Sequence, residues 1–308
     1  MKNFLAKPYR WAGVFSVLLA ASVTFTLMDT FVLEKSMAKV SASSSSAGQT
    51  VTKQTAQTTQ SSVKTAAEIT DNSYEDENIK ITIEKVRKYN TTMYVADIQV
   101  SDASYLKTAL ANNTYGRNIK SKTSEMAEEN NAIFAINGDY YGFRNTGYVL
   151  RNGTVYRSTS GNNEALVVDK EGNLSVVSES DVSMQSLSDE GAWQVFSFGP
   201  GLVENGEITV DSSSEVGQAK NSNPRTAIGQ VSKLHYIVIV SDGRTSESEG
   251  LSLLQLAQEF KERGCTTAYN LDGGGSSTMY FNGKIVNNPT DGRKIGERQV
   301  SDIVYFGY

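Results

Sequence analysis

Residues 269 to 280 read YNLDGGGSSTMY and place three consecutive glycines between an aspartate and two serines. Bare peptide N–H groups can form a concave site for an anion, and missing side chains let a ligand approach the backbone closely. A linker would not lie between two strand-like segments, as this run does. We therefore interpret the run as a ligand-binding loop. Its candidate residues are Asp272, Gly273, Gly274, Gly275, Ser276 and Ser277.

Three further polar, glycine-containing stretches lie next to predicted strands. Carboxylates can perform acid–base chemistry, and guanidinium groups can bind a phosphate bidentately. Each stretch alone is also an ordinary turn, and an isolated arginine could pair with a surface acid. Because strand ends present functional loops, we expect these stretches to meet the glycine run in one cleft. Their candidate residues are Asn137, Gly138 and Asp139 in NGDYYG, Arg225 in NPRTAIG, and Asp242 and Arg244 in SDGR.

The composition excludes several other chemistries. One cysteine, Cys265, and one histidine, His235, are too few for a Cys/His zinc cluster and make a Ser-His-Asp triad improbable. The net charge of −5 argues against nucleic-acid binding. Carboxylates grouped with asparagine can also hold Ca²⁺ or Mg²⁺. The sequence therefore predicts no certain cofactor and leaves a divalent cation open.

The elements that position these residues are short strands with few helices. We predict one α+β domain over residues 77 to 308, with a mixed, largely antiparallel sheet. Alternating residues predict strands at IKITIEKV and MYVADIQV. Helices are predicted at residues 123 to 130 and from Ser252, where Gln255 completes a capping box and Gly264 ends the helix. Hairpins are predicted at three Asn-Gly pairs: Asn152-Gly153, Asn205-Gly206 and Asn282-Gly283.

The N-terminus predicts a membrane attachment. Residues 1 to 10 are basic and form a predicted cytoplasmic tail, and residues 11 to 33 are uncharged except for Asp29. That run is long enough to cross a bilayer as a signal-anchor, with the rest of the chain exported. A signal peptide cleaved near Ala42 is the alternative. Residues 34 to 76, rich in Ser, Thr and Gln, are predicted to be a flexible linker.

Taken together, NGDYYG, NPRTAIG, SDGR, NLDGGGSSTM and ERQVSDIVYF resemble the phosphodiester glycosidase family. This family includes the lysosomal "uncovering enzyme" and bacterial exopolysaccharide-related proteins. The resemblance covers about residues 130 to 308 and implies hydrolysis of the bond between a sugar's anomeric carbon and a phosphodiester. It implies Asp272 as the first carboxylate, Asp242 or Asp139 as its partner, and Arg225 or Arg244 on the phosphate. Sugar contacts from Asn137 and Ser276 and cleft positions for Glu297 and Arg298 complete the implied site.

The predicted function is that of a membrane-anchored, extracytoplasmic hydrolase that cleaves sugar-1-phosphodiesters. Its expected setting is a bacterial cell envelope or exopolysaccharide metabolism. The expected partners are a glycan or sugar-phosphodiester substrate and the membrane, through the N-terminal helix, but no nucleic acid. The alternative is a non-catalytic glycan-binding or envelope-assembly module on the same fold.

Overall fold

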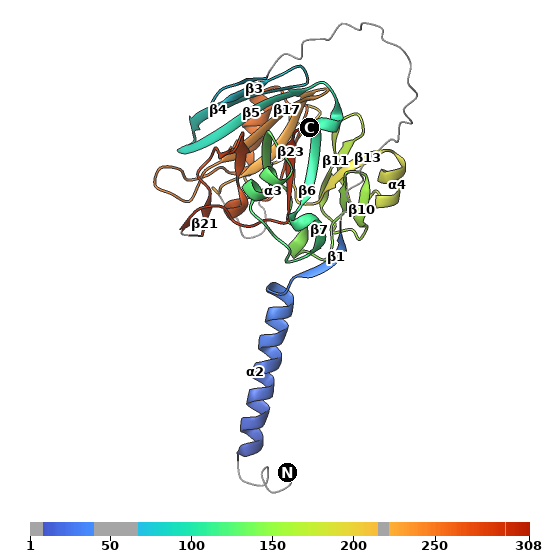
Figure 1. The fold of residues 1–308 in the computed structure, drawn as a ribbon, viewed down its shortest axis with the longest axis vertical. Helices are drawn as coiled ribbons and strands as arrows, with labels where there is room; N and C mark the ends of the chain where they lie inside the picture. The colour runs from blue at the N-terminus through green and yellow to red at the C-terminus, as the bar shows by residue number, and fades with distance from the viewer. Residues whose placement is uncertain (1–8, 40–66, 215–221, 293) are drawn as a thin grey trace, which may run out of the picture.

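The computed structural model describes residues 9–39, 67–214, 222–292 and 294–308. Helix α2 (Arg10–Phe31) projects away from a body of strands and small helices (Figure 1). All its residues are unburied, and it is the one helix among the described residues that is long and apolar enough to cross a membrane. The predicted apolar helix is therefore present, and most of the predicted tail, residues 1 to 8, lies outside the described residues.

The largest sheet has nine strands in the order β15-β14-β18-β16-β17-β5-β4-β3-β2. Every strand pair among the described residues is antiparallel. The predicted α+β fold with a largely antiparallel sheet is therefore confirmed. The sheet is not mixed, because its described strands form no parallel pair. The strands are β2 (Glu68–Ile69), β3 (Ser73–Glu75), β4 (Ile79–Lys88), β5 (Thr91–Val100), β14 (Gly201–Glu204), β15 (Glu207–Ile208), β16 (Thr226–Ser232), β17 (His235–Ser241) and β18 (Thr267–Asn270).

Two five-stranded sheets pack with the large sheet around one core. Buried side chains from all three sheets meet there, among them Ile98, Val238, Phe134, Val304 and Leu166. One sheet contains β20 (Lys284–Ile285), β19 (Met279–Phe281), β8 (Phe134–Asn137), β23 (Asp302–Phe306) and β6 (Leu106–Leu110). The other contains β10 (Thr154–Arg157), β9 (Val149–Arg151), β13 (Ala192–Phe196), β11 (Glu164–Asp169) and β12 (Leu174–Ser178).

Local sequence signals place the helices and tight turns. Helix α5 (Leu253–Glu262) begins after Ser252, whose hydroxyl accepts from the Gln255 amide in the predicted capping box. Its apolar stripe is buried against the large sheet, and Gly264 follows with φ +77°. Helix α3 (Thr123–Glu129) confirms the other predicted helix, and α4 (Met184–Asp189) was not predicted. All three Asn-Gly pairs join antiparallel neighbours, with positive φ at both residues.

The predicted linker is too long at both ends. Residues Lys35–Lys39 form β1, which pairs with β7 (Thr114–Arg117) through the backbone although its sequence shows no apolar alternation. The large sheet already begins at Glu68, and Tyr74 is buried in its core. The folded domain therefore includes residues before position 77. Residues 40 to 66, the rest of the predicted linker, lie outside the described residues.

Candidate active site

A pocket of about 460 Å³ lies where the ends of β8 and β18 meet the chain before β23. Four predicted site residues from three separate stretches line it, so the predicted convergence is real for this group. They are Asp139, Asp272, Ser276 and Arg298. The sequence analysis did not identify the other lining residues, which are Lys120, Tyr140, Phe143, Asp291, Gln299, Val300 and Ser301.

Asp272 follows β18 and lies in the pocket with a perturbed carboxyl group. Its Oδ1 accepts a hydrogen bond from the Gly273 amide at 2.9 Å. Burial raises the pKa of Asp272 to about 6, against the opposing effects of the Ser276 hydroxyl and the Arg298 charge. A carboxyl group with a pKa near neutrality can take up or release a proton under working conditions. Asp272 therefore has the position and the acidity of a general base or acid.

Asp139 lines the same pocket but is held by an ion network. Its Oδ1 accepts from the Tyr141 amide at 2.9 Å. Its Oδ2 accepts from Arg151 Nη2 at 2.9 Å and from the Ser197 amide at 3.0 Å. Arg151 is buried and also pairs with Asp302, with 2.8 Å between Nη2 and Oδ2. Because both Asp139 oxygens are occupied, this residue orders the pocket wall rather than acting as a free partner of Asp272.

Asp302 is a buried acid that the sequence analysis missed, although it lies in the quoted motif ERQVSDIVYF. Its Oδ1 has no hydrogen-bond partner among the described residues. Burial raises the pKa of Asp302 to about 7; Arg151 opposes this shift, whereas the Asp139 and Asp272 charges add to it. A side chain at Gly138 would collide with the Asp302 carboxylate, which explains this glycine. The missing side chain at Gly138 thus makes room for the Asp302 carboxylate. Asp302 is a second carboxyl group near Asp272 whose pKa is raised towards neutrality.

Two amides of the glycine run, those of Gly273 and Gly274, are hydrogen-bonded within the protein. The Gly273 amide donates to Asp272 Oδ1, and the Gly274 amide donates to the Pro224 carbonyl at 2.8 Å. The next turn uses the amides of Ser276 and Ser277, which donate to Gly273 and Gly274. The predicted cradle of open amides over Gly273 to Gly275 is therefore contradicted at Gly273 and Gly274, and at Gly275 it stays a prediction.

The glycines instead allow close approach of neighbouring groups. A Cβ at Gly273 would lie 2.8 Å from the Pro224 carbonyl oxygen, and one at Gly274 would lie 2.7 Å from Arg244 Nη2. A Cβ at Gly275 would lie 2.7 Å from Arg298 Cζ. A side chain at Gly273 would meet the backbone, and one at Gly274 or Gly275 would have to displace an arginine. The missing side chains therefore let the guanidinium groups of Arg244 and Arg298 lie directly against the backbone.

Two arginines thus contact the glycine run and offer positive charge. Arg298 donates through Nε and Nη2 to Asp291 Oδ1, at 2.9 and 2.6 Å. Arg244 is exposed, and its Nη2 donates to Asn223 Oδ1 at 3.3 Å. No ion pair formed by the described residues includes Arg244. Guanidinium groups in this setting can bind phosphate oxygens. Arg244 therefore stays the better exposed of the predicted phosphate ligands.

Asn137 is wholly buried and cross-links the loops of the site. Its Nδ2 donates to the Asp272 carbonyl at 2.7 Å, and its Oδ1 accepts from Thr226 Oγ1 at 2.8 Å. Thr278 also donates its amide to this oxygen. The side chain of Asn137 thus holds the loops of the site together, and its predicted contact with a sugar hydroxyl stays a prediction.

Arg225 and Asp242 lie beside the glycine run but do not line the pocket. Arg225 is buried, and its Nε donates to the Leu251 carbonyl at 3.0 Å. Asp242 Oδ1 accepts from the Asn288 amide at 2.7 Å. Asn287, the neighbour of Asn288, donates to the Ser277 carbonyl at 3.0 Å. These side chains support the loop structure, so their predicted catalytic placement is not seen in the described pocket.

Two further predicted residues also have structural positions. Glu297 accepts from the Ser124 amide at 3.0 Å, at the start of α3, and does not line the pocket. Ser277 is buried, and its hydroxyl has no partner among the described residues. Both lay next to true pocket residues in the sequence, which is why spacing alone could not separate them.

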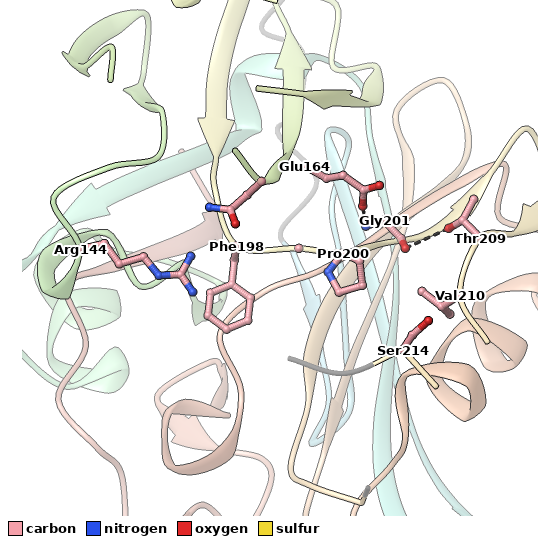
Figure 2. A pocket seen from close by; sticks show the side chains of 10 residues that line it. Arg144, Glu164, Phe198, Pro200, Gly201, Thr209, Val210 and Ser214 are labelled. Carbon is pink, nitrogen blue, oxygen red and sulfur yellow. Dashed lines mark hydrogen bonds between the residues drawn. The ribbon is translucent and has the colours of Figure 1, made fainter. Parts of the chain in front are cut away.

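A second pocket of about 430 Å³ is lined by Arg144, Glu164 and Phe198, among other residues (Figure 2). The Arg144 guanidinium lies 5.0 Å from the Phe198 ring centre and 5.7 Å from the Tyr140 ring centre. Tyr140 stacks on Phe143, and both line the first pocket. The Arg144 charge also helps to lower the pKa of Asp272. Arg144 therefore lines the second pocket and contacts an aromatic side chain of the first.

The divalent cation left open by the sequence stays untested. Among the described residues, no group of three or more acidic, histidine or cysteine side chains is arranged around one metal position. Arg151 supplies the positive charge between Asp139 and Asp302.

The fold and the pocket define an antiparallel β-domain with a carboxylate and arginine site at its strand ends. The family model described as phosphodiester glycosidase matches residues 130–307, more than half of the chain. The chain belongs to this family, and the resemblance seen in the motifs is confirmed.

Similar proteins agree with this assignment. An uncharacterised prophage-derived protein of Bacillus subtilis, YomE, is 30% identical over 202 residues, which cover 63% of this chain and 31% of that protein. The mouse N-acetylglucosamine-1-phosphodiester alpha-N-acetylglucosaminidase is 32% identical over 102 residues, covering 29% and 20%. This chain therefore spans only part of these relatives.

A solved zebrafish structure has the same fold. It is the catalytic domain of N-acetylglucosamine-1-phosphodiester alpha-N-acetylglucosaminidase, auto-inhibited by its pro-peptide, with a TM-score of 0.59 and 21% identity. The match covers 75% of this chain and 83% of that one.

Proposed function

We propose that this protein hydrolyses the bond between the anomeric carbon of a sugar and a phosphodiester. The observation that carries the proposal is Asp272, whose carboxyl group has a pKa raised to about 6 and shares a pocket with Ser276 and Arg298. Membership of the phosphodiester glycosidase family supports a hydrolase acting on a phosphodiester-linked sugar.

The chemistry needs one carboxylate at the sugar and positive charge at the phosphate. A bond forms between water oxygen and the anomeric carbon, and the bond from that carbon to the phosphate oxygen breaks. Asp272 acts either as the base that takes the water proton or as a nucleophile that water later displaces. Arg298 and Arg244 hold the charge of the departing phosphate. Because a phosphate monoester leaves readily as an anion, the reaction needs no strong general acid.

We further propose an extracytoplasmic site of action at a cell membrane. Helix α2 supports a membrane anchor, since its length and composition suit a bilayer span. The substrate would then be an envelope glycan or exopolysaccharide bearing a sugar-1-phosphodiester. The second pocket, beyond Arg144, offers room for the rest of such a substrate.

The test uses the full chain with a sugar-1-phosphodiester and measures the free sugar released. We expect Asp272→Asn to abolish most turnover while leaving the fold intact. Asp71→Asn is the matched control, because the Asp71 side chain is 95% exposed and lies outside the pocket. Assays with and without a chelator decide whether a divalent cation is required. Equal rates for Asp272→Asn and the control would remove Asp272 from the proposed mechanism.

The alternative of a non-catalytic glycan-binding module rests on one observation. Tyr140 stacks on Phe143 in the lining of the first pocket, and stacked aromatic rings suit sugar binding. Retained binding of the glycan with no release of sugar under any metal condition would favour this function.

A further inference from the structure

The last turn of α2 is bonded directly to the folded domain. Asn118 Nδ2 donates to the carbonyls of Thr30 at 3.2 Å and Leu33 at 2.9 Å, and Arg117 Nη2 donates to Thr30 at 3.5 Å. The chain then continues into β1, which pairs with β7 beside the helix end (Figure 1). The domain surface around β7 therefore has a fixed position relative to the end of the helix.

The length of α2 determines where the domain surface around β7 lies relative to a bilayer that the helix crosses. Twenty-two helical residues span about 33 Å, close to the hydrocarbon thickness of about 30 Å. When α2 crosses a bilayer, Thr30 lies near the membrane surface. Arg117 and Asn118, which contact its carbonyl, then lie at the level of the lipid headgroups.

A third pocket, of about 350 Å³, opens in this region between β1, β7 and β10. Arg117, Arg144 and Arg157 all line it. None of these three belongs to any ion pair formed by the described residues. The Nε atom of Arg117 is buried and has no hydrogen-bond partner among the described residues. Arg157 donates to three backbone carbonyls and Arg144 to one, so the described residues supply no carboxylate that neutralises any of the three charges. Such guanidinium charges favour an anion, and phosphate is an anion that arginine binds well.

Exposed apolar side chains surround the same region. Phe31 and Val32, at the helix end, are 67% and 62% exposed. Met37 and Val155, which line the pocket, are 60% and 42% exposed. Exposed apolar groups beside a basic site are typical of surfaces that lie against a bilayer. A free phosphate would explain the arginines but not this apolar rim.

We propose that this pocket binds the phosphate group of an anionic phospholipid in the leaflet at the C-terminal end of α2. The proposal goes beyond the hydrolase function and rests on α2 lying in a membrane. The lipid phosphate neutralises Arg117, Arg144 and Arg157, while the exposed apolar residues contact the upper acyl region. Lipid and helix together hold the domain against the membrane.

The test measures lipid retention by the purified full chain in detergent. The protein is mixed with equal amounts of phosphatidylglycerol and phosphatidylcholine, and native mass spectrometry counts the lipids that stay bound. We expect a preference for phosphatidylglycerol. Arg117→Gln should reduce the preference about fivefold, the change that about 1 kcal/mol per basic residue at a membrane surface gives. Arg87→Gln is the control, since it removes the same charge from an exposed residue of β4 outside the pocket.

A second pair of variants guards against a folding effect of Arg117→Gln. Val155→Glu adds a negative charge at the exposed pocket rim and should reduce the preference, whereas Val155→Gln should retain it. Equal retention of both lipids, or a preference that these charge changes leave intact, overturns the proposal.

Two further results would also overturn it. Complete displacement of phosphatidylglycerol by excess inorganic phosphate would define a free-phosphate site. Release of the full chain from membranes by alkaline carbonate would remove the membrane premise. No turnover is measured, so failure of the glycosidase assay is a separate result.

Discussion

Arg298 rests directly against Gly275, because a Cβ at Gly275 would stand 2.7 Å from the Arg298 guanidinium carbon. The same guanidinium pairs with Asp291 and lines the pocket with Asp272. A backbone position without a side chain therefore sets where a positive charge lies in the site.

Replacing Gly275 by alanine should displace Arg298 and weaken activity. The added methyl group must push the Arg298–Asp291 pair outward, at a cost of about 1–3 kcal/mol in stability. We expect a fall in kcat/KM that exceeds the effect of Gly283→Ala, where nothing lies within 4 Å and only the positive φ is strained. Steady-state kinetics and urea unfolding of both variants provide the measurements. Unchanged kinetics in Gly275→Ala would mean that the position of Arg298 is unimportant.

Replacing Arg151 by methionine should destabilise the domain strongly. Asp139 and Asp302 would lose the buried cation between them, and breaking a buried ion network costs about 3–5 kcal/mol. Urea unfolding at neutral pH measures the loss. Adding Asp302→Asn to this variant should restore part of the stability, because one uncompensated charge is removed. A double variant no more stable than the single one would contradict this account.

The stability of the domain should depend on pH through Asp272 and Asp302. Burial raises the pKa of Asp272 to about 6 and that of Asp302 to about 7, from an ordinary value near 3.8. Between these values the folded state holds more protons than the unfolded state, so these two groups make stability fall as pH rises from about 4 to about 7. Urea unfolding across this range should show a shallower fall in Asp272→Asn. The same slope in the variant and the parent would exclude this contribution.

The activity should rise with pH through the ionisation of Asp272 if this residue acts as the base or nucleophile. The rising limb of kcat/KM is expected near pH 6, where the pKa of Asp272 lies. Arg298 lowers this pKa, so Arg298→Gln should move the limb to higher pH. Lys284→Gln, an exposed charge outside the pocket, should leave it in place. A limb that does not move in Arg298→Gln would show that another group controls the rate.

Local signals predicted the fold well because they act over a few residues. The capping box at Ser252 and the Asn-Gly hairpins need only their own neighbours, and all formed as predicted. The β1 strand was missed because pairing with β7, far along the chain, supplies its hydrogen bonds. A segment whose order depends on a distant partner carries no periodic pattern of its own.

The site was predicted in part for the same reason. Asp272, Ser276 and Arg298 belong to strand-end motifs that folding brings into one pocket. Arg151 and Asp302 are 151 positions apart, and no spacing rule reveals their bond. The amide of Gly274 is occupied by Pro224, a residue 50 positions earlier. Sequence patterns indicated which side chains and amides could perform chemistry. They did not indicate which of these groups are hydrogen-bonded or ion-paired to other residues of the folded protein.

If α2 spans a bilayer, as proposed, the pairing of β1 with β7 determines how far the folded domain lies from the membrane. Lys39 and Ala67, on either side of the Ser-rich segment, both belong to the folded part of the chain. Because β1 already belongs to the folded part, the residues after Lys39 do not set the distance between the domain and α2. Under the proposed function, with α2 in a bilayer, the site would reach only polymer that comes within one domain diameter of the membrane.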